Sequence, residues 1–362
     1  DGNLSGDITV ISDGGGIIMK GSGSRSFSKI GHGGHSTDGV LGGDITVEAT
    51  YLDMMGTPII PANRNNTFVQ VGHGGINSVG AKSGDISVVV DQYINGFSGV
   101  DNQTNTNENF AMIGHGGSSS GVTAQGAGPD RDAGSVNGLA VDEAMAGHVG
   151  AIYVEAKAGD ISFRTGAMNR AFNQIGLGGY QSHGNHRLTM LSDGSQTTGA
   201  LKAGITVIAG GDINFSRSVR TNGTEAQARA QDRSYSQIGL GGWRAGGRFE
   251  GDIDIVAGGD FFMQAGSGND AYAQVGHGGV SNAGGSSGYS APDLLDPPVL
   301  EVRNGHATLS GDISLVAGGD IGMFSGAQED RAYSMVGHGG NRRIADFMLG
   351  GVEVADIDKG HH

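Results

Sequence analysis

The chain has 362 residues, of which 71 are glycine and only 16% are charged, a composition unlike that of an ordinary globular domain. The formal net charge of −15 disfavours a nucleic-acid partner, because phosphate binding needs clustered Lys and Arg, and the lack of cysteine excludes disulfides and thiolate chemistry. Because the sequence has no run of 18 apolar residues, we expect no membrane span.

Seven strand signals recur along the chain, most of them beginning Gly-Asp-Ile. Apolar and polar residues alternate in each, so one face of each strand should be buried and the other wet. We therefore predict one inward column of isoleucines, which is formed by Ile8, Ile45, Ile86, Ile152, Ile205, Ile253 and Ile313.

A second strand signal follows in the later copies, again after a Gly-Asp pair. It is clear at Gly159-Asp160, Gly211-Asp212, Gly259-Asp260 and Gly319-Asp320. Glycine suits tight corners, because it adopts positive φ and allows close backbone approach. Together with a third strand that leads into the marker pentapeptide, these signals predict three short strands per unit.

Each unit ends in a marker pentapeptide, Ile or Val followed by Gly, His or Leu, Gly and Gly. Its central residue is His32, His73, His115, Leu177, Leu240, His277 and His338 in chain order. An aromatic residue stands four positions before the first marker glycine, giving a ladder of Phe27, Phe68, Phe110, Phe172, Tyr235, Tyr272 and Tyr333. Seven strand signals and seven markers in strict alternation indicate a repeat protein.

The repeat predicts an all-β fold: a parallel β-helix, or β-solenoid, of about seven three-stranded coils in one domain over residues 1–362. A single coil cannot bury its apolar face, so the coils must stack in register. Three insertions, at 118–149, 180–202 and 280–309, are rich in Gly, Ser, Asn and Asp. We expect them to be long loops on one edge of the solenoid.

The segments Gly251–Asp260 and Ala271–Gly279 resemble the β-strand repeats of filamentous-haemagglutinin-like bacterial exoproteins. The resemblance covers essentially the whole chain apart from the loops. It implies a right-handed parallel β-helix, export across the outer membrane to an extracellular or cell-surface location, and a role in adhesion or surface structure.

Three ladders have both a structural and a chemical interpretation. Stacked marker histidines could bind a transition metal, but Leu177 and Leu240 at the same position favour an apolar corner. Stacked aromatic rings could line a sugar groove, although in-register stacking is how solenoids stabilise themselves. The corner aspartates could hold Ca²⁺, but the calcium-binding nonapeptide is absent, so we expect them to accept backbone N–H bonds.

The sequence favours a structural segment of a secreted fibre or adhesin over the alternative, a β-helix enzyme or binding module acting on polysaccharide. We assign no catalytic, metal or cofactor residue, since the copies differ mainly in their loops. The chain begins with Asp1 and has no leader, so we take it as processed or excerpted. After Gly340 an eighth unit begins at 351–355. We therefore expect end-to-end self-association, with host or matrix glycans as further partners of the loops.

Overall fold

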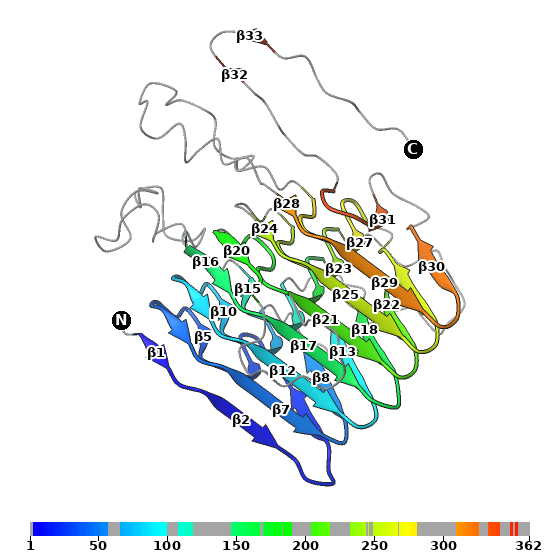
Figure 1. The fold of residues 1–362 in the computed structure, drawn as a ribbon. Coiled ribbons are helices and arrows are strands. Elements are labelled where there is room, and N and C mark those ends of the chain that lie inside the picture. Colours follow the sequence, from blue (N-terminus) through cyan, green and yellow to red (C-terminus); the bar gives the residue numbers. More distant parts are fainter. Residues whose placement is uncertain are drawn as a thin grey trace.

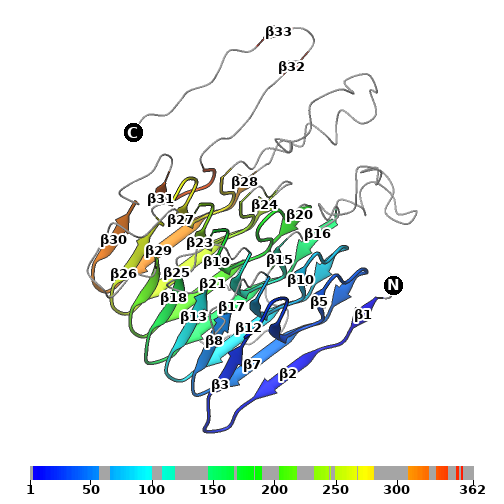
Figure 2. The ribbon, with the colours of Figure 1, turned by 180° about the vertical axis from the view of Figure 1, so that it is seen from behind.

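The coils of this chain are stacked parallel strands. The computed structural model describes residues 3–56, 66–99, 108–118, 146–166, 169–182, 184–189, 204–217, 232–243, 245, 249–266, 268–280, 309–325, 332–340, 348–349 and 352–353. Within these residues all regular structure is β, and four seven-stranded sheets run the length of a β-solenoid of seven coils (Figures 1 and 2). The predicted parallel solenoid is confirmed.

Sheet B is built from the Gly-Asp-Ile strands, which alternate inward apolar and outward polar residues. Its strands are β2 (Ile8–Ile11), β7 (Ile45–Ala49), β12 (Ile86–Val90), β17 (Ile152–Ala156), β21 (Ile205–Ala209), β25 (Ile253–Ala257) and β29 (Ile313–Ala317). Ladder pairing joins Ile8 to Ile45 and continues through each coil to Ile313. The structure thus brings the seven isoleucines into one column, and those of the five middle coils are buried.

Sheet C follows a tight corner after sheet B. Its strands are β3 (Ile17–Lys20), β8 (Leu52–Gly56), β13 (Ile94–Ser98), β18 (Ile161–Thr165), β22 (Ile213–Arg217), β26 (Phe261–Gln264) and β30 (Ile321–Phe324). In β8, β18, β22 and β26 the first and third residues lie in the central core with the isoleucine column, as Leu52, Phe163 and Phe261 do.

Sheet D carries the aromatic ladder and leads into the marker. It contains β4 (Phe27–Ile30), β9 (Phe68–Val71), β14 (Phe110–Ile113), β19 (Phe172–Ile175), β23 (Tyr235–Ile238), β27 (Tyr272–Val275) and β31 (Tyr333–Val336). In the first three coils the marker glycines also pair, as β5 (Gly33–His35), β10 (Gly74–Ile76) and β15 (Gly116–Ser118).

A fourth long sheet, sheet A, goes beyond the three strands expected per coil. Its members are β1 (Leu4–Ser5), β6 (Leu41–Gly42), β11 (Lys82–Ser83), β16 (Ala146–Val149), β20 (Asn185–Arg187), β24 (Phe249–Glu250) and β28 (Leu309–Ser310). Most have two residues, too few to show an alternation in the sequence. The coils therefore contribute to four long sheets, one more than the three strands per coil that the sequence predicted.

The insertions are shorter than predicted where the structure describes them. Residues 146–149 and 185–187, expected in loops, are strands of sheet A, and Leu309 begins β28. Residues 119–145, 183, 190–202 and 281–308 of the three insertions lie outside the described residues.

The predicted eighth unit does not extend the solenoid. Val352–Glu353 (β33) pairs antiparallel with Met348–Leu349 (β32) instead of parallel with the coil before it. A hairpin closes a loop of only a few residues, so it forms more readily than pairing with a distant coil.

Candidate functional site: the marker corner

In coils 1 to 6 the marker brings successive coils so close together that its first glycine cannot be replaced without a collision. In coils 1 to 6 the φ of this glycine lies between +139° and +152°. A Cβ on Gly276 would run into the carbonyl oxygen of Gly337 in the next coil. Left-handed backbone and close approach together explain the glycine.

The marker histidines form a hydrogen-bonded column in which both ring nitrogens of His73, His115, His277 and His338 are engaged. The Nδ1 atom of His73 accepts the backbone N–H of His32 at 2.9 Å, and His115 accepts that of His73 at 3.0 Å. Nε2 of His115 lies 2.8 Å from the carbonyl oxygen of Gly84, so Nε2 carries the proton and donates it. The rings of His73 and His115 stack with centroids 4.8 Å apart.

The same pattern recurs in the last two coils. His277 Nδ1 accepts the N–H of Leu240 at 3.2 Å, and His338 Nδ1 accepts that of His277 at 3.1 Å. His277 Nε2 lies 2.7 Å from the Gly251 carbonyl oxygen. A nitrogen that already holds a hydrogen bond has no lone pair directed at a metal ion. The arrangement therefore works as a spacer between the marker and the Gly-Asp corner.

Burial keeps these imidazoles neutral. Desolvation lowers the pKa of His73 to about 4 and that of His115 to about 3. It also lowers the pKa of His277 to about 4. Neutral rings are required for Nδ1 to accept a backbone N–H. The column is consequently sensitive to acid.

Leu177 and Leu240 interrupt the column, and the residues that accompany them were not found from the sequence. Both leucines are fully buried. In the same two coils, sheet A carries His148 and His186, whose rings stack with centroids 4.6 Å apart. The backbone N–H of His148 donates to His186 Nδ1 at 3.0 Å. Imidazole and apolar side chains have thus exchanged places between the marker and sheet A in coils 4 and 5.

The aromatic ladder runs without a break from Phe27 to Tyr333. Its ring centroids lie 4.7 to 5.2 Å apart, and Phe68 through Tyr272 are buried. Stacks this close leave no room for a ligand between the rings. These rings form an apolar cluster beside the marker, separate from the central core.

The previous coil explains which rungs of this ladder are tyrosine. Tyr272 donates its hydroxyl to Gln237 Oε1 at 3.3 Å, and Tyr235 and Tyr333 make the same bond to Gln174 and Gln274. Phenylalanine occurs where the previous coil offers no acceptor. In coil 4, Phe172 follows Met112 of coil 3, which offers no such acceptor. In coil 3, Phe110 follows Gln70 of coil 2, whose Oε1 already accepts from Lys29 at 2.6 Å.

The glutamines complete this network. Gln237 Nε2 lies 2.9 Å from the Gly276 carbonyl oxygen and 3.2 Å from that of Gly278. The glycine carbonyls of one coil are thereby satisfied by the amide of the coil before it, as buried polar groups require. Met112 and Met335 occupy the same column.

The corner aspartates accept backbone hydrogen bonds, as the sequence predicted. Asp7 Oδ1 accepts the N–H of Asp44 at 3.0 Å, and Asp260 Oδ1 accepts that of Asp320 at 2.7 Å. The bond repeats at Asp44, Asp85, Asp160, Asp212 and Asp252. Within the described ranges, no group of three or more His, Cys, Asp or Glu is placed to hold a metal ion.

Comparison with family models, curated proteins and solved structures gives no match for this chain. Over the described residues, the structure contains no helix long and apolar enough to cross a membrane.

Proposed function

We propose that this chain is a structural segment of an extracellular fibre or adhesin, and that copies of it stack end to end through their first and last coils. The observation that carries the proposal is the continuity of the ladders. The isoleucine, aromatic and marker-histidine columns are all present in coil 1 and in coil 7. The last coil of one copy can therefore act as the coil before the first coil of the next.

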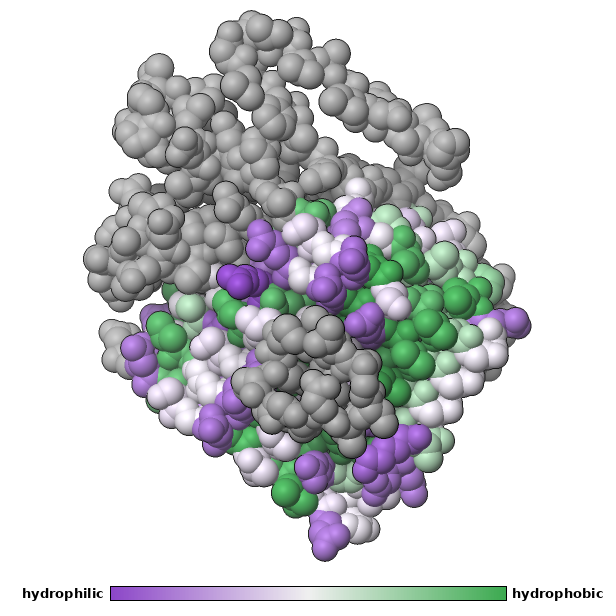
Figure 3. All heavy atoms as spheres, in the orientation of Figure 1, coloured by the Kyte–Doolittle hydropathy of each residue, from purple (hydrophilic) through white to green (hydrophobic). Residues whose placement is uncertain are grey.

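The apolar residues of the end coils support this. Most of the exposed large hydrophobic side chains belong to coils 1 and 7, and Figure 3 shows hydrophobic residues gathered over β29 and β30. Five of them belong to columns that are fully buried in the middle coils. These five are Leu4, Phe27, Ile321, Met323 and Val336, with 37 to 51% of their surface exposed.

A neighbouring coil would bury these five side chains and pair the open strand edges. Full burial of one large apolar side chain contributes about 1.5–3 kcal/mol, so the half-exposed set offers several kcal/mol before the cost of association. A junction of this kind is head-to-tail and does not close, so it propagates as a fibre.

Two glycines allow each end to be blocked separately. Gly6 has φ +146° with nothing within 4 Å of a Cβ, whereas a Cβ on its equivalent Gly43 would strike Gly6 of the previous coil. Gly337 has φ +147° and only Met335 Cγ, at 3.9 Å, near a Cβ. Gly6→Ala therefore obstructs the first coil, and Gly337→Ala the last, without a clash among the described residues of the monomer.

The experiment compares wild type with these two variants, alone and mixed, by light scattering and electron microscopy. Wild type should form filaments at high concentration, and each variant alone should stay monomeric. An equimolar mixture should form a one-to-one dimer, in which the open last coil of Gly6→Ala meets the open first coil of Gly337→Ala. This dimer does not extend, because both of its outer faces are blocked. This dimer also shows that both variants are folded. A wild-type chain that stays monomeric, or variants that still polymerise, would overturn the proposal.

A further inference from the structure

The repeat is broken at one corner, between sheets B and C. Coils 4 to 7 turn this corner with a Gly-Asp pair, such as Gly159-Asp160. Coils 2 and 3 turn it with Thr50-Tyr51 and Gln92-Tyr93 instead. The corner ladder of aspartates is thus replaced by tyrosine in two adjacent coils, where neither the central core nor the marker requires it.

The two tyrosines stack in the open, unlike the buried ladder of sheet D. The rings of Tyr51 and Tyr93 lie with centroids 5.1 Å apart and planes 15° apart, and both side chains are partly exposed. Tyr51 covers one face of the Tyr93 ring. No ring follows in coil 4, because Asp160 occupies the equivalent position.

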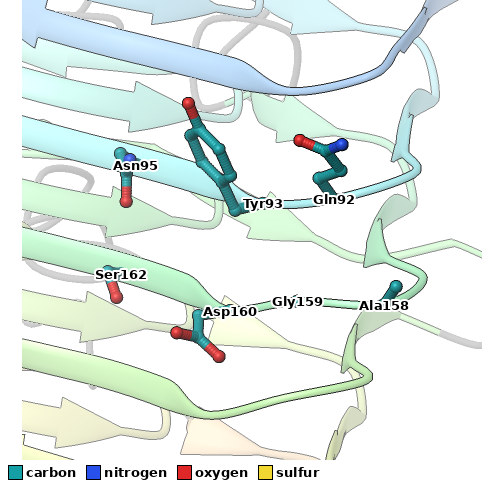
Figure 4. A pocket seen from close by; sticks show the side chains of 7 residues that line it. All are labelled: Gln92, Tyr93, Asn95, Ala158, Gly159, Asp160 and Ser162. Atoms are coloured by element: carbon teal, nitrogen blue, oxygen red, sulfur yellow. The ribbon is translucent and has the colours of Figure 1, made fainter.

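A surface hollow of about 370 Å³ lies where the tyrosine stack ends. Figure 4 shows its lining in two rows. Gln92, Tyr93 and Asn95 come from the corner and strand β13 of coil 3. The equivalent part of coil 4 contributes Ala158, Gly159, Asp160 and Ser162. The small residues Ala158 and Gly159 leave the space that a third ring would fill.

Polar groups border the hollow on the outer face of sheet C. Asn95 is exposed, pairs in register with Ser162, and donates from Nδ2 to Asp53 Oδ1 at 3.0 Å. Asp160 is also exposed, and only its Oδ1 is used by the N–H of Asp212. A hydroxyl, two amides and a carboxylate therefore surround an aromatic ring.

We propose that this hollow binds a neutral saccharide, with the apolar C–H face of a pyranose on the Tyr93 ring. The carboxylate of Asp160 and the amides of Asn95 and Gln92 then hydrogen-bond the sugar hydroxyls. An aromatic platform with a few polar groups that fix orientation is the composition of a small-molecule site.

The charges around the hollow select against acidic sugars. Asp160 lines it, and Asp53 is hydrogen-bonded to the lining residue Asn95. Lys157, the nearest cation in sequence to the lining, is paired with Asp91 at 3.0 Å. Arg164 lies over the Phe97 ring, with 4.7 Å between the guanidinium carbon and the ring centroid. A uronic or sialic acid would meet like charge, which disfavours binding. This inference goes beyond the structural role and does not depend on end-to-end assembly.

The test is a glycan array of neutral and acidic oligosaccharides, followed by calorimetric titration of the best neutral glycan. We expect Tyr93→Ala to weaken binding at least tenfold, because the stacking platform is lost, and Tyr93→Phe to retain most of it. Asp160→Asn keeps the acceptor for Asp212 and should weaken binding several-fold. Gly337→Ala, which alters only the far end, should bind as wild type does.

Thermal melting of each variant separates lost binding from lost folding, since a partly exposed corner residue should shift the midpoint little. The proposal would be overturned if the wild type bound no neutral glycan or only acidic ones. It would also be overturned if Tyr93→Ala bound the neutral glycan as tightly as the wild type does.

Discussion

Gly276→Ala and Gly337→Ala form a matched pair that measures how much one stacked coil contributes at the marker. Each is the first glycine of a Val-Gly-His-Gly-Gly marker, and their φ values are +139° and +147°. Alanine in this region costs about 1–3 kcal/mol at either position, because L side chains rarely adopt it. The two sites differ in what lies above them: Gly276 is covered by coil 7, and Gly337 is not.

Only the Gly276 variant must push two coils apart. Relieving its clash with the Gly337 carbonyl stretches the bond from Gly337 N–H to Val275 O, now 2.8 Å, and that from Gly339 N–H to His277 O, now 2.9 Å. It also disturbs the Gln274 amide, 3.0 Å from the Gly337 carbonyl oxygen. At about 0.5–1.5 kcal/mol for each backbone bond and about 1–3 kcal/mol for the amide, Gly276→Ala should cost about 2–6 kcal/mol more than Gly337→Ala.

The assay is urea unfolding followed by circular dichroism, at concentrations where both variants are monomeric. Hydrogen exchange over coils 6 and 7 should accompany it, because repeat proteins can unfold coil by coil. Faster exchange at β31 in Gly276→Ala alone would agree with the structure. Equal destabilisation by the two substitutions would refute the stacking argument, since backbone strain alone would then account for both.

Two further predictions concern the interior. Ile253→Asp should lower the free energy of unfolding by several kcal/mol, because it buries a charge in the isoleucine column, whereas Val256→Asp, on the outer face of the same strand and 41% exposed, should change it little in urea unfolding. The free energy of unfolding should fall as the pH drops from about 6.5 towards 4, because the unfolded chain takes up protons there while the lowered pKa values of His73, His115 and His277 keep the folded rings neutral. Urea titration at each pH should show this loss, up to about 3 kcal/mol per histidine. The loss should be smaller in His277→Leu, which we expect to fold because Leu177 and Leu240 already occupy the marker position. An unfolding midpoint that does not change with pH would contradict this prediction.

The sequence was informative wherever one residue type recurs at one position. Gly-Asp-Ile and the marker identify their strands, because the same isoleucine, glycine or ring must stack on its copy in the next coil. Sheet A could not be recognised in this way, because its inward position is held by residues as different as Leu41, Lys82, His148 and Phe249. The sequence signal for sheet A was a large residue two positions before the glycine that begins the Gly-Asp-Ile strand signal, as Leu41 is before Gly43.

Two other features could not be read from one coil at a time. The exchange of imidazole and leucine in coils 4 and 5 involves two strands that are distant in sequence, and the choice of Tyr or Phe depends on the coil before. Val352–Glu353 has the alternation of a sheet B strand but pairs locally in a hairpin, since a strand pattern does not specify its partner.

End-to-end stacking in register is tested most directly by cysteine cross-linking. Thr9 and Ser314 are exposed, and ladder pairing places them in one outward column of sheet B, six coils apart. At about 4.8 Å per coil they are separated by about 29 Å within one chain, but they would be neighbours across a junction. The chain has no cysteine of its own, so the introduced thiols are the only ones.

With a short bifunctional thiol reagent, the double variant Thr9→Cys/Ser314→Cys should yield a ladder of dimers, trimers and longer oligomers on a denaturing gel. Each single variant should remain monomeric. Dimers from either single variant would indicate a two-fold contact, and a double variant that stays monomeric would show no junction at all; either result would contradict the account.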